Sequence, residues 1–443
     1  MRIVVIGAGE VGSNIAASLA DDHEIVVIDR DGERVESLTY SEDVLAIEGD
    51  GTSLDVLEEA GIIDADIVIA STDNDETNIV ICSTTAVVSD AFTIARVRNT
   101  EFLKTWRRSD RAFGIDFMVC TDLLTAQTIA RIVGLPGARD VDPFAGGRVQ
   151  MAEFEVTEES PIAGQTVSEA DQFEELTFAA LLHDGEVRIP TGRSVIEVGW
   201  KIVVIGTPQC VRSFAGMVSP GDEHGSDILM IGGGSIGEET ARVLSERGLE
   251  PRIIEADETR ARRLAEDLLD TVVMHHDPTD AEFLEREHIE ATDLVVACLE
   301  SDERNLLVAL LAKRLGADRA VAVVENGESV DLFEAVGVDI AINPREVTAE
   351  EITRFTREQR TENVALIESD RAEVLEIEID ADSILADRPI RESIQDLPDG
   401  VVIGAITRDG TFITPRGDTA IQPADHVVVF VDAQALDEVM TKL

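Results

Sequence analysis

The sequence predicts an α/β protein with two parallel-sheet domains, each followed by a small α+β domain rich in strands. Three observations lead to this prediction. A glycine-rich turn occurs twice, each turn lies between an apolar strand-like run and a helical stretch, and each half ends in a segment of alternating Val and Ile. Apolar runs that alternate with helical stretches of ten or more residues are typical of a parallel, doubly wound sheet.

The chain repeats itself once along its length. IVVIGAGEVGSNIAASLA at 3–20 corresponds to ILMIGGGSIGEETARVL at 228–244, and the strand-rich segment at 188–206 corresponds to the one at 412–431. Such self-similarity marks a duplicated structural unit. Glycine and proline punctuation places boundaries near residues 145, 220 and 365. We therefore expect four domains, at residues 1–140, 145–222, 226–362 and 364–443.

Acidic side chains outnumber basic ones by more than two to one. The 443-residue chain carries 89 acidic and 37 basic residues, for a formal net charge of -52. Nucleic acid is not expected as a partner, because phosphate binding needs a basic surface. Such a charge causes strong self-repulsion in dilute salt, whereas molar salt shortens the Debye length to about 3 Å. We therefore expect a halophilic protein; the alternative, an acidic metal-binding surface, fits poorly with acids spread along the whole chain.

The spacing of the cysteines and the hydropathy of the chain indicate whether a metal site, a disulfide framework or a membrane span is expected. The cysteines, at Cys82, Cys120, Cys210 and Cys298, form no CxxC pair, so neither a zinc site nor a disulfide framework is expected. The sequence starts with a strand-like run and no signal peptide, and no apolar run reaches the roughly 18 residues of a membrane span. We expect a cytoplasmic protein without a bound metal.

The first glycine-rich turn has the G-x-G-x-x-G spacing of a dinucleotide-binding loop. It follows a strand-like run, opens a helix, and precedes Asp29 at the end of the next strand, a context that predicts a Rossmann-like domain. Its glycines permit a tight turn, close approach to a pyrophosphate and packing of the helix on the sheet. Asp29 can accept hydrogen bonds from ribose hydroxyls and would repel a 2′-phosphate, so NAD or an adenine nucleotide is favoured over NADP. The turn consists of Gly7, Ala8, Gly9, Glu10, Val11 and Gly12.

The second half repeats this arrangement. Its turn consists of Gly232, Gly233, Gly234, Ser235, Ile236 and Gly237. Glu255 ends the next strand and can do the work of Asp29 with a longer side chain. The alternative is a glycine turn that serves packing in an empty site, and it applies to the second half more than to the first.

Further polar residues follow the third strand of each half. Asp50 comes directly after Gly49, and Asp277 lies at the matching place in HHDPTD. Either can face an adenine edge or cap the following helix. His275 and His276 are adjacent, so on a strand they point to opposite faces and do not predict a metal site.

One cation distinguishes the two halves. Arg96 in TIARVR ends a predicted strand, whereas the matching residue of the second half is Val323. A cation at the carboxyl edge of a parallel sheet can pair with phosphates, and the alternative is that it pairs with a nearby acid. The two sites are therefore not expected to be equivalent.

Ligand binding without turnover is the expected chemistry. A dehydrogenase needs a proton-transfer residue near the nicotinamide, but His183 and His426 of the strand-rich segments occupy no matching positions and no recognisable motif. Two copies of one dinucleotide domain leave little chain for a substrate pocket. A ligand sensor whose nucleotide shifts a conformational equilibrium accounts for the pattern better.

These motifs resemble the RCK family. GAGEVG, GDGTSLDVLEEAGIIDADIVIASTDNDETN and IARVRN resemble the signature of its Rossmann-like RCK-N domain, and LPDGVVIGAITRDGTFITPRGDTAIQPADHVVVF resembles that of its RCK-C domain. Two RCK-N/RCK-C units in one chain are similar to the TrkA family of the Trk potassium-uptake system. The resemblance covers essentially the whole chain.

The resemblance implies a non-catalytic cytoplasmic regulator that acts at the inner face of the membrane. Its cofactor is expected to be NAD(H), with ATP or ADP as further candidates, and its partner a TrkH-like potassium-transport subunit. Family nucleotide contacts carry over to the first turn, Asp29, Thr72, Asp73 and Arg96, and to the second turn and Glu255. RCK units also imply a homo-oligomeric gating ring, expected to be a tetramer for two units per chain.

The second half departs from the family pattern at two positions. Pro278 replaces a small residue in HHDPTD, and Leu299 replaces the threonine that matches Thr72. Nucleotide binding in the second half is therefore the weaker expectation. Three other interpretations stay open: a regulator of a different ion channel or antiporter, an NAD-dependent oxidoreductase, and a scaffold with empty sites.

Overall fold

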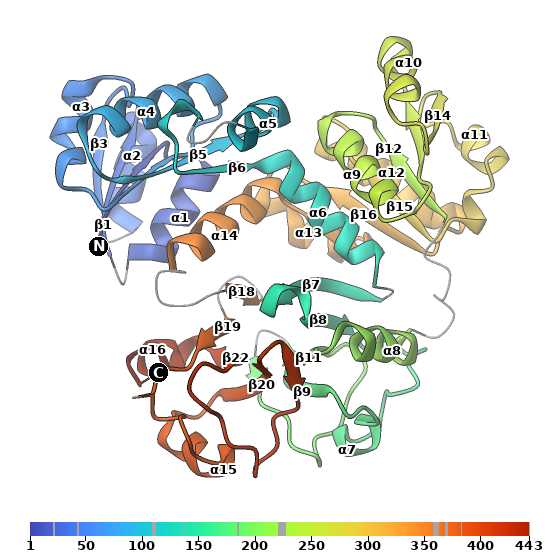
Figure 1. The fold of residues 1–443 in the computed structure, drawn as a ribbon. Coiled ribbons are helices and arrows are strands. Elements are labelled where there is room, and N and C mark those ends of the chain that lie inside the picture. Colours follow the sequence, from blue (N-terminus) through green and yellow to red (C-terminus); the bar gives the residue numbers. More distant parts are fainter. Residues whose placement is uncertain are drawn as a thin grey trace. The chain divides into compact units, whose positions relative to one another are not determined.

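The chain folds into two compact units (Figure 1). The computed structural model describes residues 1–20, 23–41, 44–108, 112–135, 137–183, 186–219, 227–357, 363–367, 371–381 and 383–442. The first unit consists of Met1–Ala130 and Ser226–Thr353, and the second of Arg131–Gly225 and Arg354–Leu443. Each unit combines one domain from each half of the chain, so corresponding parts of the repeat come together.

In the first unit, the first half forms a six-stranded parallel sheet of order β3-β2-β1-β4-β5-β6. Its strands are β1 (Arg2–Ile6), β2 (Glu24–Asp29), β3 (Leu45–Glu48), β4 (Ile67–Ala70), β5 (Phe92–Val97) and β6 (Phe117–Cys120). The central strand β4 reads IVIA and is buried at every position, as expected for a parallel strand covered on both faces. The strand order reverses between β1 and β4, and open sheets of this kind bind ligands at the carboxyl ends of their strands at this point.

Helices alternate with these strands. They are α1 (Glu10–Ala20), α2 (Gly32–Ser41), α3 (Leu54–Glu59), α4 (Asp75–Val88), α5 (Thr100–Arg108) and α6 (Thr121–Val133). Helix α4 begins at Asp75 because the Asn74 side chain accepts a hydrogen bond from the Thr77 backbone N–H at 2.7 Å. Its buried face carries Asn78 and Ile81, which places one polar side chain beside the ends of β4 and β5.

The second half of the first unit repeats this architecture with the order β14-β13-β12-β15-β16-β17. Its strands are β12 (Ile228–Ile231), β13 (Arg252–Glu255), β14 (Val272–His275), β15 (Leu294–Ala297), β16 (Arg319–Val323) and β17 (Ile340–Ile342). Its helices are α9 (Ser235–Glu246), α10 (Glu258–Asp267), α11 (Ala281–Arg286), α12 (Asp302–Leu315), α13 (Val330–Ala335) and α14 (Pro344–Arg357). The predicted repeat of Rossmann-like domains is therefore confirmed, strand by strand.

The second unit contains two five-stranded antiparallel sheets, of order β10-β9-β11-β8-β7 and β18-β19-β22-β20-β21. The strands of the first sheet are β7 (Ala138–Phe144), β8 (Val149–Glu155), β9 (Leu176–His183), β10 (Glu186–Arg188) and β11 (Lys201–Gly206). Those of the second are β18 (Asn363–Ile367), β19 (Ala372–Glu378), β20 (Val401–Arg408), β21 (Thr411–Ile413) and β22 (His426–Asp432). The helices of this unit are α7 (Val167–Ala170), α8 (Pro208–Val218), α15 (Ile390–Ser393) and α16 (Leu436–Lys442).

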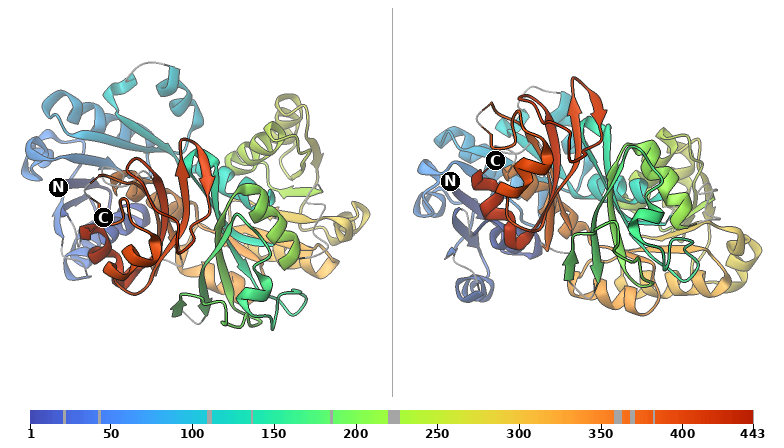
Figure 2. Two further views of the ribbon diagram at one scale, coloured as in Figure 1. Left: turned by 60° about the horizontal axis from the view of Figure 1, so that its bottom comes forward. Right: turned by 90° about the horizontal axis from the view of Figure 1, so that it is seen from below.

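The two antiparallel sheets lie against each other (Figure 2), and their side chains form one shared apolar core. Ile205 of β11 and Phe430 of β22 both belong to this core and are fully buried. Gly404 lets the two sheets approach closely, because a Cβ at this position would lie 2.5 Å from Ile205 Cδ1 and 3.1 Å from Ile205 Cβ. The Ala145 backbone N–H also donates a hydrogen bond to Glu376 of the other sheet at 2.8 Å. The predicted strand-rich domains are therefore present and pack as a pair.

The structure can be compared with the predicted domain boundaries and with the expectation that the chain has no membrane span. Strand β7 pairs with β8, so the first antiparallel sheet begins at Ala138, before the boundary predicted near residue 145. The boundary predicted near residue 220 lies outside the described residues, and β18 begins at Asn363, beside the one predicted near residue 365. Among the helices in the described stretches of the chain, none has the length and apolar character that crossing a membrane requires.

Candidate functional site

The first glycine-rich turn joins β1 to α1 and needs glycine at two positions. Gly7 has φ +107°, a conformation that other residues rarely adopt. A Cβ on Gly12 would lie 1.7 Å from the Gly7 carbonyl oxygen, so only glycine lets α1 approach the turn this closely. Gly9 has more room, since the nearest atom to its Cβ position is an Arg34 guanidinium nitrogen at 3.6 Å. The turn therefore presents the Gly9 backbone at the N-terminus of α1, where a phosphate can bind.

A cavity of about 390 Å³ lies beside this turn, at the carboxyl ends of the strands. The predicted site residues that line it are Gly7, Gly9, Glu10, Val11, Asp29, Asp50, Thr72, Asp73 and Arg96. Ala8 and Gly12 belong to the turn without lining the cavity. The structure thus brings together residues that the sequence places at the ends of separate strands.

The Asp29 carboxylate lies between the turn and the cavity. Its Oδ2 accepts a hydrogen bond from the Ala8 backbone N–H at 2.5 Å, and its Oδ1 accepts one from the Asp31 backbone N–H at 2.8 Å. These donors hold the carboxylate in one orientation while the residue still lines the cavity. A carboxylate fixed at this position can accept hydrogen bonds from ribose hydroxyls.

Asp50 lines the cavity as part of an ion pair. Its Oδ1 accepts hydrogen bonds from Arg30 at 2.7 Å and from the Thr52 hydroxyl at 2.7 Å. The hydrogen bonds from Arg30 and Thr52 lower the pKa of Asp50 to about 2. Ser53, not Asp50, is the N-cap residue of helix α3, so the alternative that Asp50 caps this helix is wrong. Asp50 remains an ionised hydrogen-bond acceptor at the edge of the cavity.

Asn78 of α4 organises the loop that follows β4. Its Oδ1 accepts hydrogen bonds from the Thr72 backbone N–H at 3.0 Å and from the Thr72 hydroxyl at 2.6 Å. Its Nδ2 donates to the carbonyl oxygens of Thr72 and Arg96, both at 2.9 Å. Asn78 was not among the predicted site residues. The signal for it was available in the repeat, because Asn305 occupies the same position in the second half and bonds the Leu299 backbone in the same way.

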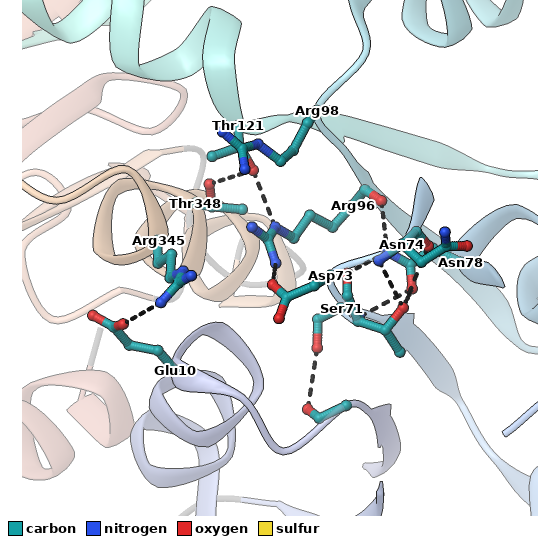
Figure 3. Close-up of polar contacts among 12 residues, drawn as sticks. Glu10, Ser71, Asp73, Asn74, Asn78, Arg96, Arg98, Thr121, Arg345 and Thr348 are labelled. Carbon is teal, nitrogen blue, oxygen red and sulfur yellow. Dashed lines mark hydrogen bonds and ion pairs between the residues drawn. The ribbon is translucent and has the colours of Figure 1, made fainter. Parts of the chain in front are cut away.

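Arg96 is a buried cation at the end of β5, with only 4% of the residue exposed. Its NH1 donates to Asp73 Oδ1 at 3.3 Å, and its Nε donates to Thr121 Oγ1 at 3.1 Å (Figure 3). Burial lowers the pKa of the guanidinium, and the Asp73 carboxylate opposes this shift. The alternative that Arg96 pairs with an acid therefore holds, and the residue also lines the cavity. The Asp73 side chain is 72% exposed, so a phosphate could replace it without stranding a buried carboxylate.

The second half of the chain reaches this cavity through Arg345. This residue lies in the first turn of α14, and its NH1 is 3.0 Å from Glu10 Oε2 (Figure 3). Glu10 Oε1 also accepts hydrogen bonds from the Gly327 backbone N–H at 3.0 Å and from Asn343 Nδ2 at 2.7 Å. The local sequence motifs gave no signal for this contact, because its partners are 317 to 335 residues apart along the chain.

Arginine side chains concentrate around the cavity. Those in its lining are Arg30, Arg34, Arg96 and Arg345. Four carboxylates, Glu10, Asp29, Asp50 and Asp73, balance their formal charge, so in a chain with a net charge of -52 this cavity repels an anionic ligand less than the chain as a whole does. Three of the lining carboxylates are paired with these arginines, in the pairs Asp50–Arg30, Asp73–Arg96 and Glu10–Arg345. Asp29 is instead held by backbone N–H groups, which leaves its remaining acceptor capacity for hydroxyl groups of a ligand.

The second glycine-rich turn has the same backbone geometry. Gly232 has φ +108°, and a Cβ on Gly237 would lie 2.1 Å from the Gly232 carbonyl oxygen. Glu255 Oε2 accepts a hydrogen bond from the Gly233 backbone N–H at 2.8 Å and lies 3.6 Å from Arg260 NH1. Only 5% of Glu255 is exposed. Its carboxylate is therefore engaged by the protein and largely shielded from a ligand.

The cavity beside the second turn has a different lining. It has a volume of about 480 Å³ and includes Gly233, Gly234 and Ser235 of the predicted set. The predicted residues outside its lining are Gly232, Ile236, Gly237 and Glu255. Charged side chains of both signs line the rest of it: the cations Lys104, Arg242, Arg260 and Arg263 and the carboxylates Glu101, Glu238, Glu239, Asp267 and Glu300. The structure thus assembles only part of the predicted second site, and Leu299 supplies an apolar side chain 3.1 Å from the Gly232 Cβ position.

The residues after β14 serve the local fold. Asp277 accepts hydrogen bonds from Thr279 and does not cap helix α11, whose N-cap residue is Asp280, so the capping alternative is wrong here too. The His276 ring stacks on Phe283 with 3.9 Å between the ring centroids. Within the part of the chain that the structure describes, no group of three or more His, Cys, Asp or Glu residues is placed to hold a metal ion.

Comparison with known proteins shows the family. The TrkA-N domain matches residues 3–121 and 228–344, and the TrkA-C domain matches residues 151–217 and 374–443. The chain belongs to the TrkA family. It is 36% identical over 441 residues, 99% of each chain, to the Trk system potassium uptake protein TrkA homolog of Archaeoglobus fulgidus. Membership of this family confirms the resemblance seen in the sequence and the expectation of a regulatory protein without catalytic activity.

Solved structures show the same fold. The GsuK RCK domain is similar with a TM-score of 0.61 and 21% identity, over 99% of this chain and 95% of that chain. The GsuK channel bound to NAD is similar with a TM-score of 0.61 and 20% identity, over 100% of this chain and 78% of that chain. These likenesses confirm the predicted fold of RCK-N and RCK-C domains.

Proposed function

We propose that this protein is the nucleotide-sensing regulatory subunit of a Trk potassium-uptake system and that its first-half cavity binds NAD(H). The observation that supports this most strongly is the convergence of three features on one cavity. These are an open glycine turn at a helix N-terminus, the fixed carboxylate of Asp29 and the buried guanidinium of Arg96. The similarly folded GsuK channel was solved bound to NAD, and ADP or ATP would satisfy the same groups.

In this proposal each part of the nucleotide has a defined partner. The pyrophosphate lies at the N-terminus of α1, whose first N–H groups have no partner within the helix. The ribose hydroxyls donate to Asp29, Arg96 pairs with a phosphate, and ionised Asp50 accepts from the adenine amino group. The proposed cofactor-binding residues of the first half are Gly7, Ala8, Gly9, Glu10, Val11, Gly12, Asp29, Asp50, Thr72, Asp73 and Arg96.

We propose weaker nucleotide binding for the second half, through the turn of residues 232–237 and Glu255. Three features support the difference. Glu255 is shielded and already bonded to Gly233, Val323 replaces the cation of the first half, and Leu299 replaces its threonine. A titration that counts bound nucleotide per chain tests this: about one equivalent at low concentration is expected, and two equal sites would contradict it.

We propose that the chains close into a homo-oligomeric ring, a tetramer, at the cytoplasmic face of the membrane, where the ring gates a TrkH-like subunit. Two RCK units per chain supply one intramolecular pair of Rossmann-like domains, which here form one compact unit. Closed symmetric rings satisfy the remaining interaction surfaces of such units. Nucleotide binding then changes transport by shifting the population of ring conformations.

Potassium flux into vesicles that hold the membrane subunit tests the proposal. Flux is measured with the purified protein and with NAD, NADH, ADP or ATP in turn. A change of flux with at least one nucleotide is expected, and no change with any of them would refute the sensor. A response with another channel or antiporter but not with the Trk subunit would favour that alternative partner, and steady oxidation of NADH would favour an oxidoreductase.

We also infer that the protein is adapted to molar salt. The support is the excess of 89 acidic over 37 basic residues, spread along the whole chain. Mutual repulsion of the carboxylates has a long range in dilute solution and a range of about 3 Å in molar salt. The stability of the fold is therefore expected to rise with salt concentration.

A further inference from the structure

We propose that Arg345, supplied by the second half of the chain, is a phosphate-binding residue of the first-half site and that it exchanges Glu10 for the phosphates when a nucleotide binds. This inference rests on the proposed function, and it adds a regulatory contact between the two halves. As a consequence, the contacts of helix α14 in the second half change when a nucleotide occupies the cavity of the first half.

The first observation is the position of Glu10. Glu10 is the first residue of α1, so its carboxylate lies next to the place where a helix N-terminus binds phosphate. The carboxylate points across to Arg345 of the second half (Figure 3) and also accepts hydrogen bonds from Gly327 and Asn343. A phosphate bound at this N-terminus brings a like charge close to Glu10 and therefore weakens the hold of Glu10 on its partners.

The second observation is the environment of Arg345. Its side chain lines the cavity and is 31% exposed, so it can move within reach of a ligand. Apart from Glu10, it contacts the carboxylate of Glu325 at 3.6 Å and the Glu325 carbonyl oxygen at 3.2 Å. Arginine binds phosphate through several N–H groups at once, and the pyrophosphate carries more negative charge than one carboxylate. Exchange of Glu10 for phosphate therefore keeps the guanidinium paired.

A second connection joins the same cavity to the same helix. Arg96 Nε donates to Thr121 Oγ1, and the Thr121 and Thr348 hydroxyl oxygens are hydrogen-bonded at 3.0 Å (Figure 3). Thr348 lies three positions after Arg345 on α14, so the two side chains share one face of the helix. Of the two candidate phosphate-binding arginines, Arg345 is therefore part of α14 and Arg96 is linked to this helix through Thr121.

At the corresponding positions of the two halves, the pair formed by Glu10 and Arg345 is not repeated. GIDFMVCTDLL at 114–124 corresponds to GVDIAINPREV at 337–347, so Asp122 takes the place of Arg345. Asp122 is 2% exposed, lies 3.4 Å from Arg98 and is not part of the lining of the second cavity. Ser235 takes the place of Glu10 in the second turn. The exchange of partners is therefore a property of the first-half site.

Calorimetric titration of NAD and ADP into four variants tests the inference. Glu10→Gln keeps the oxygen that accepts from Gly327 but removes the charge that holds Arg345, so it should tighten binding, by roughly threefold to tenfold. Arg345→Ala should weaken binding by roughly tenfold, and Arg345→Lys by less. In the Glu10→Gln background, Arg345 binds phosphate without first leaving a carboxylate, so it contributes more to affinity there. Arg345→Ala should therefore weaken binding more in this background than in the parent. Melting temperatures confirm that each variant is folded.

Arg262→Ala is the matched control. Arg262 lies in the second half, pairs with Glu258 at 2.8 Å and is 69% exposed, outside the lining of either cavity. This variant should bind as the parent does. Hydrogen exchange of the α14 backbone should change when NAD is added to the parent and change far less in Arg345→Ala.

The outcomes separate the two proposals. If the parent binds none of the nucleotides, the proposed function fails. If the parent binds but Glu10→Gln and Arg345→Ala both leave its affinity unchanged, or both weaken it equally, the exchange of partners is overturned while nucleotide binding stands. Opposite changes in affinity, together with the larger loss in the double variant and the response of α14, support the inference.

Discussion

The Asp29→Ala substitution tests two roles of this carboxylate: holding the backbone of the glycine-rich turn and binding the ribose of a nucleotide. In the structure its carboxylate accepts hydrogen bonds from the backbone N–H groups of Ala8 and Asp31, and in the proposed complex it also accepts from ribose hydroxyls. A hydrogen bond to a charged group contributes about 1.5–3 kcal/mol. The Asp29→Ala variant should therefore bind NAD about tenfold to a hundredfold more weakly than the parent.

The cost to folding should be smaller than the cost to binding. The two backbone donors lose their acceptor, which lowers the free energy of unfolding by about 1–2 kcal/mol because the exposed N–H of Asp31 can turn to water. The turn itself stays defined by Gly7 and Gly12, whose close contacts do not involve Asp29. Thermal melting at a fixed salt concentration measures this cost separately from affinity.

Glu255→Ala is the control for this experiment. Glu255 holds the corresponding position in the second half and also bonds a backbone N–H of its turn, but it is shielded from the adjoining cavity. Isothermal titration with NAD should therefore show parental affinity at the tighter, first-half site for Glu255→Ala and weakened affinity at that site for Asp29→Ala. Parental affinity in Asp29→Ala, or an equal loss in both variants, would falsify the assignment of the nucleotide to the first half.

Four further outcomes are expected. Arg96→Ala should reduce the ability of the protein to discriminate among nucleotides in the vesicle flux assay while the oligomer stays assembled by light scattering; an unchanged response would place phosphate sensing elsewhere. The melting temperature should rise from low to molar potassium chloride, and a flat profile would contradict salt adaptation. Burial and the nearby Asp142 carboxylate raise the pKa of Asp140 to about 7. The protonated side chain therefore contributes its full stabilisation of the fold below about pH 4, and this contribution is lost as the pH rises through 7. Asp140→Asn should accordingly stabilise the fold at pH 8, by about 1–2 kcal/mol, and leave it unchanged at pH 4. Gly12→Ala should lower the free energy of unfolding by about 3 kcal/mol or more, because its Cβ would overlap the Gly7 carbonyl, whereas Gly216→Ala, which has open space in α8, should be neutral or slightly stabilising.

The fold could be predicted because its signals are local. An apolar strand-like run, a glycine turn and a helical stretch follow one another within about 20 residues in each half. The requirement for Gly7 and Gly12 comes from contacts between residues five positions apart in the same turn. Once the repeat was recognised, each half supported the assignment of the other, and the strand order of the two sheets followed from the Rossmann pattern.

The site was predictable only where its residues end a strand of their own domain. Asp29, Thr72 and Arg96 meet because the carboxyl ends of parallel strands lie at one edge of the sheet. The capping role considered for Asp50 was wrong because Arg30 and Thr52 supply nearer donors and Ser53 takes the cap position. These preferences depend on distances in the folded chain, which spacing alone does not give.

Arg345 illustrates what a sequence motif cannot reveal. Its contact with Glu10 depends on how two complete domains pack, and neither residue stands near the other in any motif. The repeat does hold indirect information, since Arg345 and Asp122 occupy corresponding positions with opposite charge. That difference becomes meaningful only when the structure shows that α14 of one half lies at the cavity of the other.

The duplicated backbone makes the differences between the halves informative. Corresponding strands and turns give both halves the same backbone framework, so the difference between the two cavities lies in the side chains that line them. Val323 in place of Arg96 removes a cation from the second cavity, whereas Arg345 adds a cation from the second half to the first cavity. Both differences place an arginine beside the first glycine turn, whereas the cations that line the second cavity share it with five carboxylates. A chain built this way has one cavity suited to an anionic nucleotide and one partner domain whose helix α14 is in contact with it, which is the minimum that a sensor needs to pass occupancy from one half to the other.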